Sequence, residues 1–254
     1  MLKIEMSKLL KRKDILMLFT MLVIPLFYSI GLYFDFSLIT YNGETQEYAL
    51  KFMVSMFEFV FAIFLYFFML ALSTSHTLAG EISNKSIAYY LQRINDRKKI
   101  YLSKKYSLIA IFSIICILFS IATIALYYIF VIHRPDVATT TFIVYDEVLF
   151  LFSKFIIIYL FYITIISYSL FLSTFVKKNL VILVTIFTLI ILMYMEYIPI
   201  VQYLSPFYYI TEISKLSPSS DRLIPLLLIG TVMHIFYNII CDTIGIKIFN
   251  KKDL

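Results

Sequence analysis

The sequence predicts an all-α integral membrane protein with six transmembrane helices and both termini in the cytoplasm. Three observations support this prediction. The 254 residues are 61% hydrophobic, well above the roughly 45–50% apolar usage of soluble domains. Six apolar runs each reach the about 18 residues that a helix needs to cross a bilayer. The Lys and Arg residues gather on one side of these runs. We therefore expect a single transmembrane domain over residues 1–254.

The first element is a helix ahead of the first apolar run. Leu2, Met6, Leu9 and Leu10 fall on one helical face, and the basic residues Lys3, Lys8 and 11–13 lie elsewhere. Such a pattern predicts an amphipathic helix that lies in the cytoplasmic membrane interface, with a frayed basic tail as the alternative. The run near residues 14–34 follows. It has no A-x-A-like cleavage site, so we expect an uncleaved span rather than a signal peptide.

Five further spans follow at residues 52–79, 106–132, 148–176, 179–197 and 222–247. Lys177 and Lys178 lie between the fourth and fifth apolar runs. Because two charges in the centre of a bilayer are costly, these runs are two spans and not one long one. The two lysines predict a tight turn at the membrane surface. The segment 198–221 contains three prolines and several tyrosines. It fits an ordinary outward loop with tyrosines at the membrane interface.

The distribution of basic residues predicts the orientation. Of the 22 Lys and Arg residues, 17 lie in the N-terminal segment, the loop 80–105, the 177–178 turn and the C-terminal tail. The positive-inside rule places all four in the cytoplasm. Basic residues that flank spans also explain the net charge of +6. A nucleic-acid partner is therefore not expected.

Motifs for chemistry are missing from the sequence. Its five glycines form neither GxxxxGK[ST] nor GxGxxG, and it contains no HExxH or GxSxG. Cys116 and Cys241 lie in apolar runs without a CxxC motif. We expect no catalytic residue, no metal and no cofactor in this chain.

Three ionisable residues fall inside the predicted spans, where such groups are costly and often functional. Glu58 is expected to pair with Lys51 or with a neighbouring helix. Asp242 lies about one turn from Lys247, close enough to the cytoplasmic surface to reach it. His234 is the most central. Each residue either makes an interhelical hydrogen bond or lines a polar translocation path. Their different depths argue against an intramembrane enzyme.

The loop 80–105 has more order than a topological anchor needs. An apolar stripe at i, i+3, i+4 and i+7 predicts a short helix of about three turns, and its members are Ile87, Tyr90, Leu91 and Ile94. Asn95 and Asp96 break the period. Asp96 is a good N-cap for a second helix that starts at Arg97 and continues into the third span. The loop is therefore predicted to form a helix–turn–helix elbow.

A register of residues runs through this elbow and its flanks: Ala79 and Glu81, then Lys85-Ser86-Ile87, Tyr90-Leu91, Ile94-Asn95-Asp96-Arg97 and Lys104. It resembles the second cytoplasmic loop of permease subunits of ATP-binding-cassette transporters of the type-2 exporter class. That loop has A-x-E, Gly-Thr-Leu, a Leu-Leu pair, Pro-x-x-Arg and a Lys. Glu81, Arg97 and Lys104 match outright and Ser86 nearly matches, whereas Lys85 and Ile94 replace the usual Gly and Pro. Pro25 in the first span, the stretch 204–207 and the ending 248–254 are also similar to the family. The family often has a short re-entrant or interfacial helix before the last span, and the resemblance implies this helix within 198–221, as the alternative to an outward loop.

The resemblance implies a division of labour between subunits. The permease carries no ATPase; its elbow contacts a separate cytoplasmic ATP-binding-cassette subunit, present in two copies, which binds ATP and Mg²⁺. A second copy of the permease, or a related one, would complete the transporter. The residues expected to couple the permease to the ATPase are Glu81, Ser86, Ile87, Tyr90, Leu91, Ile94, Asp96, Arg97 and Lys104.

The resemblance also suggests a substrate class. The resemblance to compact permeases of this family implies that the chain exports an amphipathic or hydrophobic substrate from a bacterial plasma membrane. An antimicrobial or cytolytic peptide is the substrate that the resemblance favours. Drug or sodium extrusion by the same architecture is one alternative. A non-transporting protein, such as a bacteriocin-immunity protein or a sensor, is another; its basic loop would serve only topology or anionic lipid.

Overall fold

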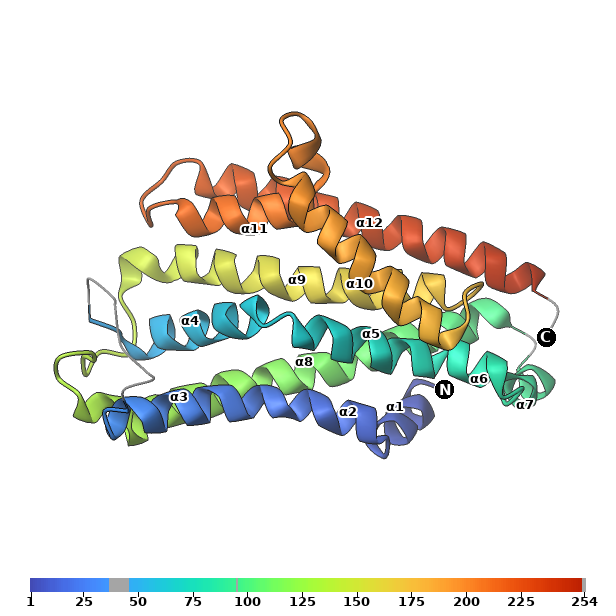
Figure 1. Ribbon diagram of the computed structural model, residues 1–254, viewed down its shortest axis with the longest axis horizontal. Helices are drawn as coiled ribbons and strands as arrows, with labels where there is room; N and C mark the ends of the chain where they lie inside the picture. Colours follow the sequence, from blue (N-terminus) through green and yellow to red (C-terminus); the bar gives the residue numbers. More distant parts are fainter. Residues whose placement is uncertain (37–45, 95, 253–254) are drawn as a thin grey trace.

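The computed structural model describes residues 1–36, 46–94 and 96–252, and these residues form helices and no strand (Figure 1). The α-helices are α1 (Leu2–Leu10), α2 (Lys13–Leu18), α3 (Val23–Tyr33), α4 (Ala49–Ala62), α5 (Leu65–Thr77), α6 (Ala79–Ser83), α7 (Ile87–Arg93), α8 (Arg97–Ile129), α9 (Val148–Leu172), α10 (Lys178–Met195), α11 (Pro206–Lys215) and α12 (Leu223–Lys251). Short 3₁₀ helices η1 to η4 span Phe19–Leu22, Val131–His133, Tyr145–Glu147 and Val201–Leu204.

Most of the long helices lie along one axis. Figure 1 shows α1, α7 and the last turn of α12 at one end of this bundle, which we call the elbow end. The segment between α8 and α9 lies at the opposite end, called the far end. The chain thus returns to the elbow end after each pair of passes, as the alternation of segments rich and poor in Lys and Arg predicted.

Five helical runs in the described residues are long and apolar enough to cross a membrane: Lys13–Tyr33, Arg97–His133, Tyr145–Leu172, Lys178–Met195 and Leu223–Lys251. A sixth exists if two helices joined by a bend count as one span. The all-helical fold with five or six candidate spans is consistent with a multi-pass membrane protein.

The bend replaces the continuous second span predicted over 52–79. Ala49–Ala62 and Leu65–Ser83 meet at an angle of 70°, and Ile63 between them is extended. The sequence here contains neither Pro nor Gly, the usual causes of a sharp kink. Aromatic rings from three helices meet at the break instead. The Phe61 ring lies 5.3 Å from Phe67 and 5.5 Å from Phe161. Tertiary packing of these rings therefore accompanies a helix break that the local sequence does not predict.

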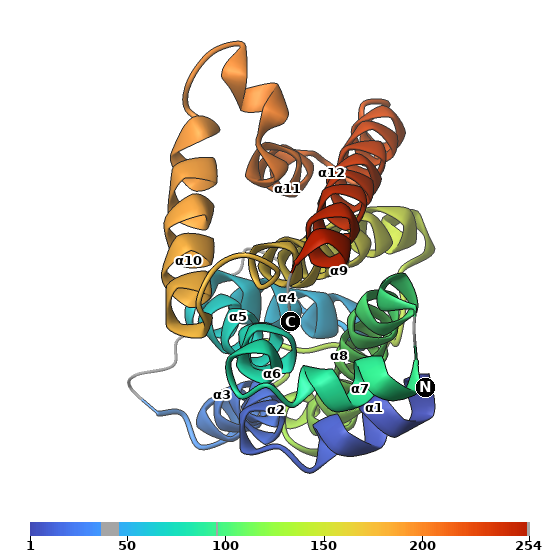
Figure 2. The same ribbon diagram turned by 90° about the vertical axis from the view of Figure 1, so that its right-hand side faces the viewer.

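The core lies around α9. Its neighbours α4, α5 and α8 bury large rings against it, among them Phe57, Phe67 and Phe119, and Tyr162 of α9 itself is fully buried. Figure 2 shows α10 at the edge of the bundle, where one side of it packs on α5. In the most apolar stretches of α10 and α12, 22% and 17% of the residues are buried, compared with 50% in the run that contains α9. These two helices therefore present wide apolar surfaces to whatever surrounds them.

The predicted N-terminal helix is confirmed as α1, but its buried face differs from the predicted one. Glu5 and Leu9 are each 1% exposed, whereas Leu2 and Leu10 are 43% and 46% exposed. The difference arises because the Glu5 carboxylate turns inward to meet a lysine of α8. One face of α1 therefore packs on the protein, and its exposed leucines remain free for a membrane interface.

The segment 198–221 contains a helix, as one of the two sequence alternatives proposed. Pro206 stands in the first turn of α11, a position that proline favours. Phe207, Ile210 and Ile213 are buried against the rest of the protein. The helix packs beside α9 and α12.

Candidate functional site

The elbow has the helix–corner–helix backbone that the sequence predicted. The side chain of Asp96 accepts a hydrogen bond of 3.0 Å from the Lys99 amide, which confirms Asp96 as the N-cap of α8. Asn95, the other predicted corner residue, lies outside the described residues. Helix α7 has seven residues, fewer than the three turns predicted. Lys85 before it has a φ of 57°. This left-handed conformation favours glycine, the residue that the resembled family carries at this position.

The apolar stripe of the elbow faces inward. Ile87 is 1% exposed and belongs to a cluster at the elbow end that also contains Tyr101 and Phe249. Tyr90, Leu91 and Ile94 are half-buried against that cluster, whereas Ser86 is half-buried and bonds locally to the Glu81 carbonyl. The stripe therefore attaches α7 to the protein itself.

The outward side of α7 carries other residues. Tyr89 is 71% exposed, and Gln92 and Arg93 are exposed on the same helix. Lys98 and Lys99 are exposed at the start of α8. An aromatic side chain among basic groups is typical of the surfaces that bind another protein. The sequence prediction, which used the apolar stripe as the contact surface, did not include these exposed residues.

Four charges form a buried cluster behind the elbow, which we call the four-charge cluster: Glu5, Lys8, Glu81 and Lys104. The Lys104 Nζ atom lies 2.6 Å from Glu81 Oε2 and 3.3 Å from Glu5 Oε2. Lys8 forms an ion pair with the other Glu81 oxygen. Lys104 is 0% exposed. The structure thus brings together Glu81 and Lys104, two residues predicted from the family register, and adds two from α1.

The electrostatics of this cluster favour the charged form of Lys8. Burial lowers the pKa of Lys8, but the hydrogen bond and the negative charge of Glu81 outweigh it and leave that pKa above its usual 10.5. Burial, followed by the charge of Glu5, raises the pKa of the Tyr90 hydroxyl. Two carboxylates and two ammonium groups balance each other. The cluster joins α1, α6 and α8 as one brace.

Arg97, the third residue that matches the family register, points toward the end of α12. Its Nη1 atom donates to the carbonyl oxygens of Phe249, Asn250 and Lys252 at 2.9, 3.1 and 2.6 Å. Carbonyls in the last turn of a helix have no partner within the helix. Arg97 therefore caps α12 and is committed to an internal contact.

Two more contacts between α8 and α12 follow Arg97 at intervals of one helical turn. Tyr101 packs so closely on Gly245 that a Cβ atom there would lie 2.7 Å from the tyrosine oxygen. The Lys105 Nζ atom lies 2.5 Å from Asp242 Oδ2. We call these three contacts the α8–α12 ladder. It fixes the start of α8 to the last candidate span.

The three ionisable residues predicted inside the spans are not brought together. Glu58 pairs with Lys154 of α9 at 3.0 Å and accepts a hydrogen bond of 3.1 Å from Ser214 of α11. A neighbouring helix thus supplies its partner, as one alternative proposed. Asp242 belongs to the α8–α12 ladder. Its pairing with Lys105 was not predicted from the sequence. The arrangement favours interhelical pairing over one continuous polar path.

His234 belongs to a polar chain between α9 and α12. Its Nδ1 atom lies 2.9 Å from Thr164 Oγ1, and Asn238 Nδ2 donates to the same oxygen at 3.1 Å. Ser167 donates to Asn238. Sequence reasoning missed these partners, although the i, i+4 spacing of His234 and Asn238 could have revealed a polar face. Nε2 of His234 is buried without a hydrogen-bond partner in the described part of the chain.

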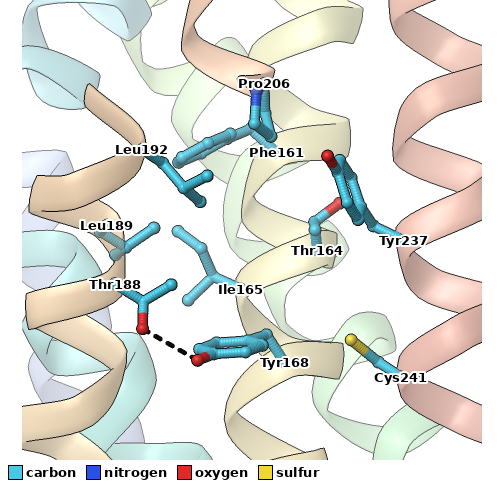
Figure 3. A pocket seen from close by; sticks show the side chains of 10 residues that line it. All are labelled: Phe161, Thr164, Ile165, Tyr168, Thr188, Leu189, Leu192, Pro206, Tyr237 and Cys241. Carbon is cyan, nitrogen blue, oxygen red and sulfur yellow. Dashed lines mark hydrogen bonds between the residues drawn. The ribbon is translucent and has the colours of Figure 1, made fainter. Parts of the chain in front are cut away.

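A pocket lies beside this polar chain, between α9, α10 and α12 (Figure 3). Thr164 and Tyr168 of α9 face Thr188 and Leu192 of α10, and Tyr237 of α12 closes a third side. The Tyr168 hydroxyl lies 2.9 Å from Thr188 Oγ1. The volume of the pocket is about 70 Å³, which is below the roughly 300–1,000 Å³ of ligand sites. One copy of the chain does not enclose a peptide-sized chamber at this place.

Other chemistry finds no support in the described residues. They contain no group of three or more His, Cys, Asp or Glu side chains that could hold a metal ion. Comparison with protein-family models, curated proteins and solved structures gives no match for this chain.

Proposed function

We propose that this chain is the permease subunit of an ATP-binding-cassette transporter of the type-2 exporter class, which works with a separate ATPase subunit in a bacterial plasma membrane. The observation that carries the proposal is the elbow. A short exposed helix meets, at a capped corner, an unbroken helix of 33 residues. At 1.5 Å per residue, α8 is about 50 Å long and reaches from the elbow to the far end.

The surface offered to the ATPase is the outward side of α7 with the start of α8. Tyr89, Gln92 and Arg93 are exposed there. Tyr and Arg are the residues that most often dominate binding energy at protein interfaces. The residues of the family register support this surface from behind, because Glu81 and Lys104 hold the elbow to α1, and Arg97 holds it to α12. The elbow end faces the cytoplasm in this proposal.

ATP can drive transport only if it binds one conformation of the complex more tightly than another. The elbow must therefore pass a displacement into the membrane helices. Its four-charge cluster and the α8–α12 ladder make α1, α8 and α12 move with it. Loops that are attached by flexible linkers alone would not transmit such a displacement.

Two copies of the permease would form the substrate path between them. The weakly buried helices α10 and α12 support this arrangement, since Phe187 of α10 and Val232 of α12 are 65% and 63% exposed. The small volume of the pocket in Figure 3 also favours a path formed between copies. An amphipathic peptide or another hydrophobic molecule is the substrate class that such apolar walls suit.

A photo-crosslinking residue in place of Tyr89 tests the proposal in cells of the native host. We expect it to capture a protein with a nucleotide-binding motif, and the same residue in place of Tyr145, which is 85% exposed at the far end, to capture no such protein. Arg93→Glu should then lower the affinity of the purified pair by about thirtyfold, the loss of one interface hot spot. Capture of a protein without a nucleotide-binding motif, or an unchanged affinity, would favour the non-transporting alternative.

A further inference from the structure

A cavity of about 550 Å³ opens at the elbow end, between α6, the turn that leads into α10, and the end of α12. We call it the three-lysine cavity, because Lys177, Lys178 and Lys252 line it and no acidic residue does. Phe175 and Leu180 form an apolar part of its wall, and each is 49% exposed. The cavity therefore presents both cationic and greasy surfaces at one end of the candidate spans.

The three lysines differ from the two buried lysines at this end of the molecule. Lys104 and Lys105 are both paired with carboxylates at 2.6 and 2.5 Å. In the described residues no carboxylate forms an ion pair with any lysine of the three-lysine cavity. The positive charge there is therefore available for an anion from outside the chain.

The local backbone adds to this positive potential. Helix α10 begins directly after Lys177, without a side-chain cap and without an acidic residue in its first turn. Negative charge is favoured at the start of a helix and positive charge is not. Lys252 is held at the rim, because its Nζ atom donates to the Thr174 carbonyl at 2.8 Å. Three cations beside a helix start, of which Lys252 is tethered, repel one another and favour the binding of an anion.

We propose that the three-lysine cavity binds the phosphate headgroup of an anionic phospholipid, with an acyl chain along Phe175 and Leu180. Basic pockets between membrane helices on the cytoplasmic side bind anionic headgroups in this way. The apolar wall favours a lipid over a free phosphate ion. Helix α6, which borders the cavity, also carries Glu81 of the four-charge cluster. A bound lipid would therefore connect the membrane surface to the elbow, whether or not the chain transports anything.

The chain contains no tryptophan, so Phe175→Trp provides a single fluorescent reporter at the cavity. The variant is reconstituted into phosphatidylcholine vesicles that contain, at equal mole fraction, brominated phosphatidylglycerol or brominated phosphatidylcholine. Bromine atoms on a lipid quench the fluorescence of a tryptophan that the lipid contacts. We expect stronger quenching by phosphatidylglycerol. Adding Lys177→Gln, Lys178→Gln and Lys252→Gln should lower this preference by about fivefold per lysine.

Two further variants in the Phe175→Trp background separate the specific site from general attraction. Arginine at the three lysine positions keeps the charge and should keep the preference. Gln in place of Lys3, Lys11 and Lys13 removes three exposed charges from the same end and should also keep it. Equal quenching by the two lipids would overturn the proposal and leave the cavity as a surface for an acidic protein. Loss of the preference in the second variant, or on addition of inorganic phosphate, would overturn it as well.

Discussion

Lys104 shows how the family register acts at the scale of single residues. The residue is completely buried, and two carboxylates lie within 3.3 Å of its ammonium group. A lysine that served only to keep a loop in the cytoplasm would remain in water. Its position instead makes it the central charge of an internal brace.

Replacement of Lys104 is expected to destabilise the protein strongly. Lys104→Met leaves Glu5 buried without its ion-pair partner and Glu81 with Lys8 alone, and the free energy of unfolding should fall by about 3–5 kcal/mol. Thermal unfolding of the detergent-solubilised protein measures this. Lys98→Met is the matched control, because Lys98 is exposed and surface substitutions usually change stability by less than about 0.5 kcal/mol. Equal midpoints for the two variants would contradict the brace.

At the scale of elements, the two arms that leave the elbow differ in continuity. Helix α8 has no break over 33 residues, whereas the preceding arm is divided into α4, α5 and α6, with a bend of 70° between the first two. The α8–α12 ladder holds the continuous arm. Helix α12 therefore follows α8 more closely than it follows the divided arm.

The middle rung of the ladder offers a test by compensation. A Cβ atom at position 245 would lie 2.7 Å from the Tyr101 oxygen, so Gly245→Ala should cost about 1–3 kcal/mol through overpacking. Tyr101→Phe removes that oxygen, which has no hydrogen-bond partner among the described residues, and should be nearly neutral. The double variant should recover part of the lost stability in the same unfolding assay, because ring carbons at 3.0 and 3.2 Å from the added Cβ remain. An additive loss in the double variant would show that the rung does not exist.

The sequence was sufficient for the elements that depend on composition and spacing. Apolar run length predicted the helices of five spans, and residue chemistry predicted the Asp96 cap. It was not sufficient where a contact between distant segments decides the outcome. The break after Ala62 has no local signal, and Glu5 turned inward because Lys104 lies opposite. The partner of Asp242 was missed for the same reason, since 137 residues separate it from Lys105.

At the scale of the whole molecule, orientation is the property that every functional argument here requires. The two ends of the bundle have distinct exposed markers, Tyr89 at the elbow end and Tyr145 at the far end, which are 71% and 85% exposed. The native Cys116 and Cys241 are buried. An introduced cysteine can therefore be labelled above a silent background.

Labelling with a membrane-impermeant maleimide tests the orientation directly. Tyr145→Cys should react in intact cells, because the far end is expected to face outward under the positive-inside rule. Tyr89→Cys should react only after the cells are permeabilised, and the unsubstituted protein should remain unlabelled in both conditions. Labelling of Tyr89→Cys in intact cells would reverse the orientation and remove the elbow from the reach of any cytoplasmic ATPase.

The unequal arms have a mechanical consequence for the proposed transporter. A continuous helix conserves its length, so a push on the start of α8 arrives at the far end undiminished. The divided arm absorbs the same push as a change in the angle after Ala62. One stroke at the elbow would thus produce two displacements of different size on opposite sides of the core. Displacements of unequal size would allow one end of the proposed substrate path to open while the other end stays closed.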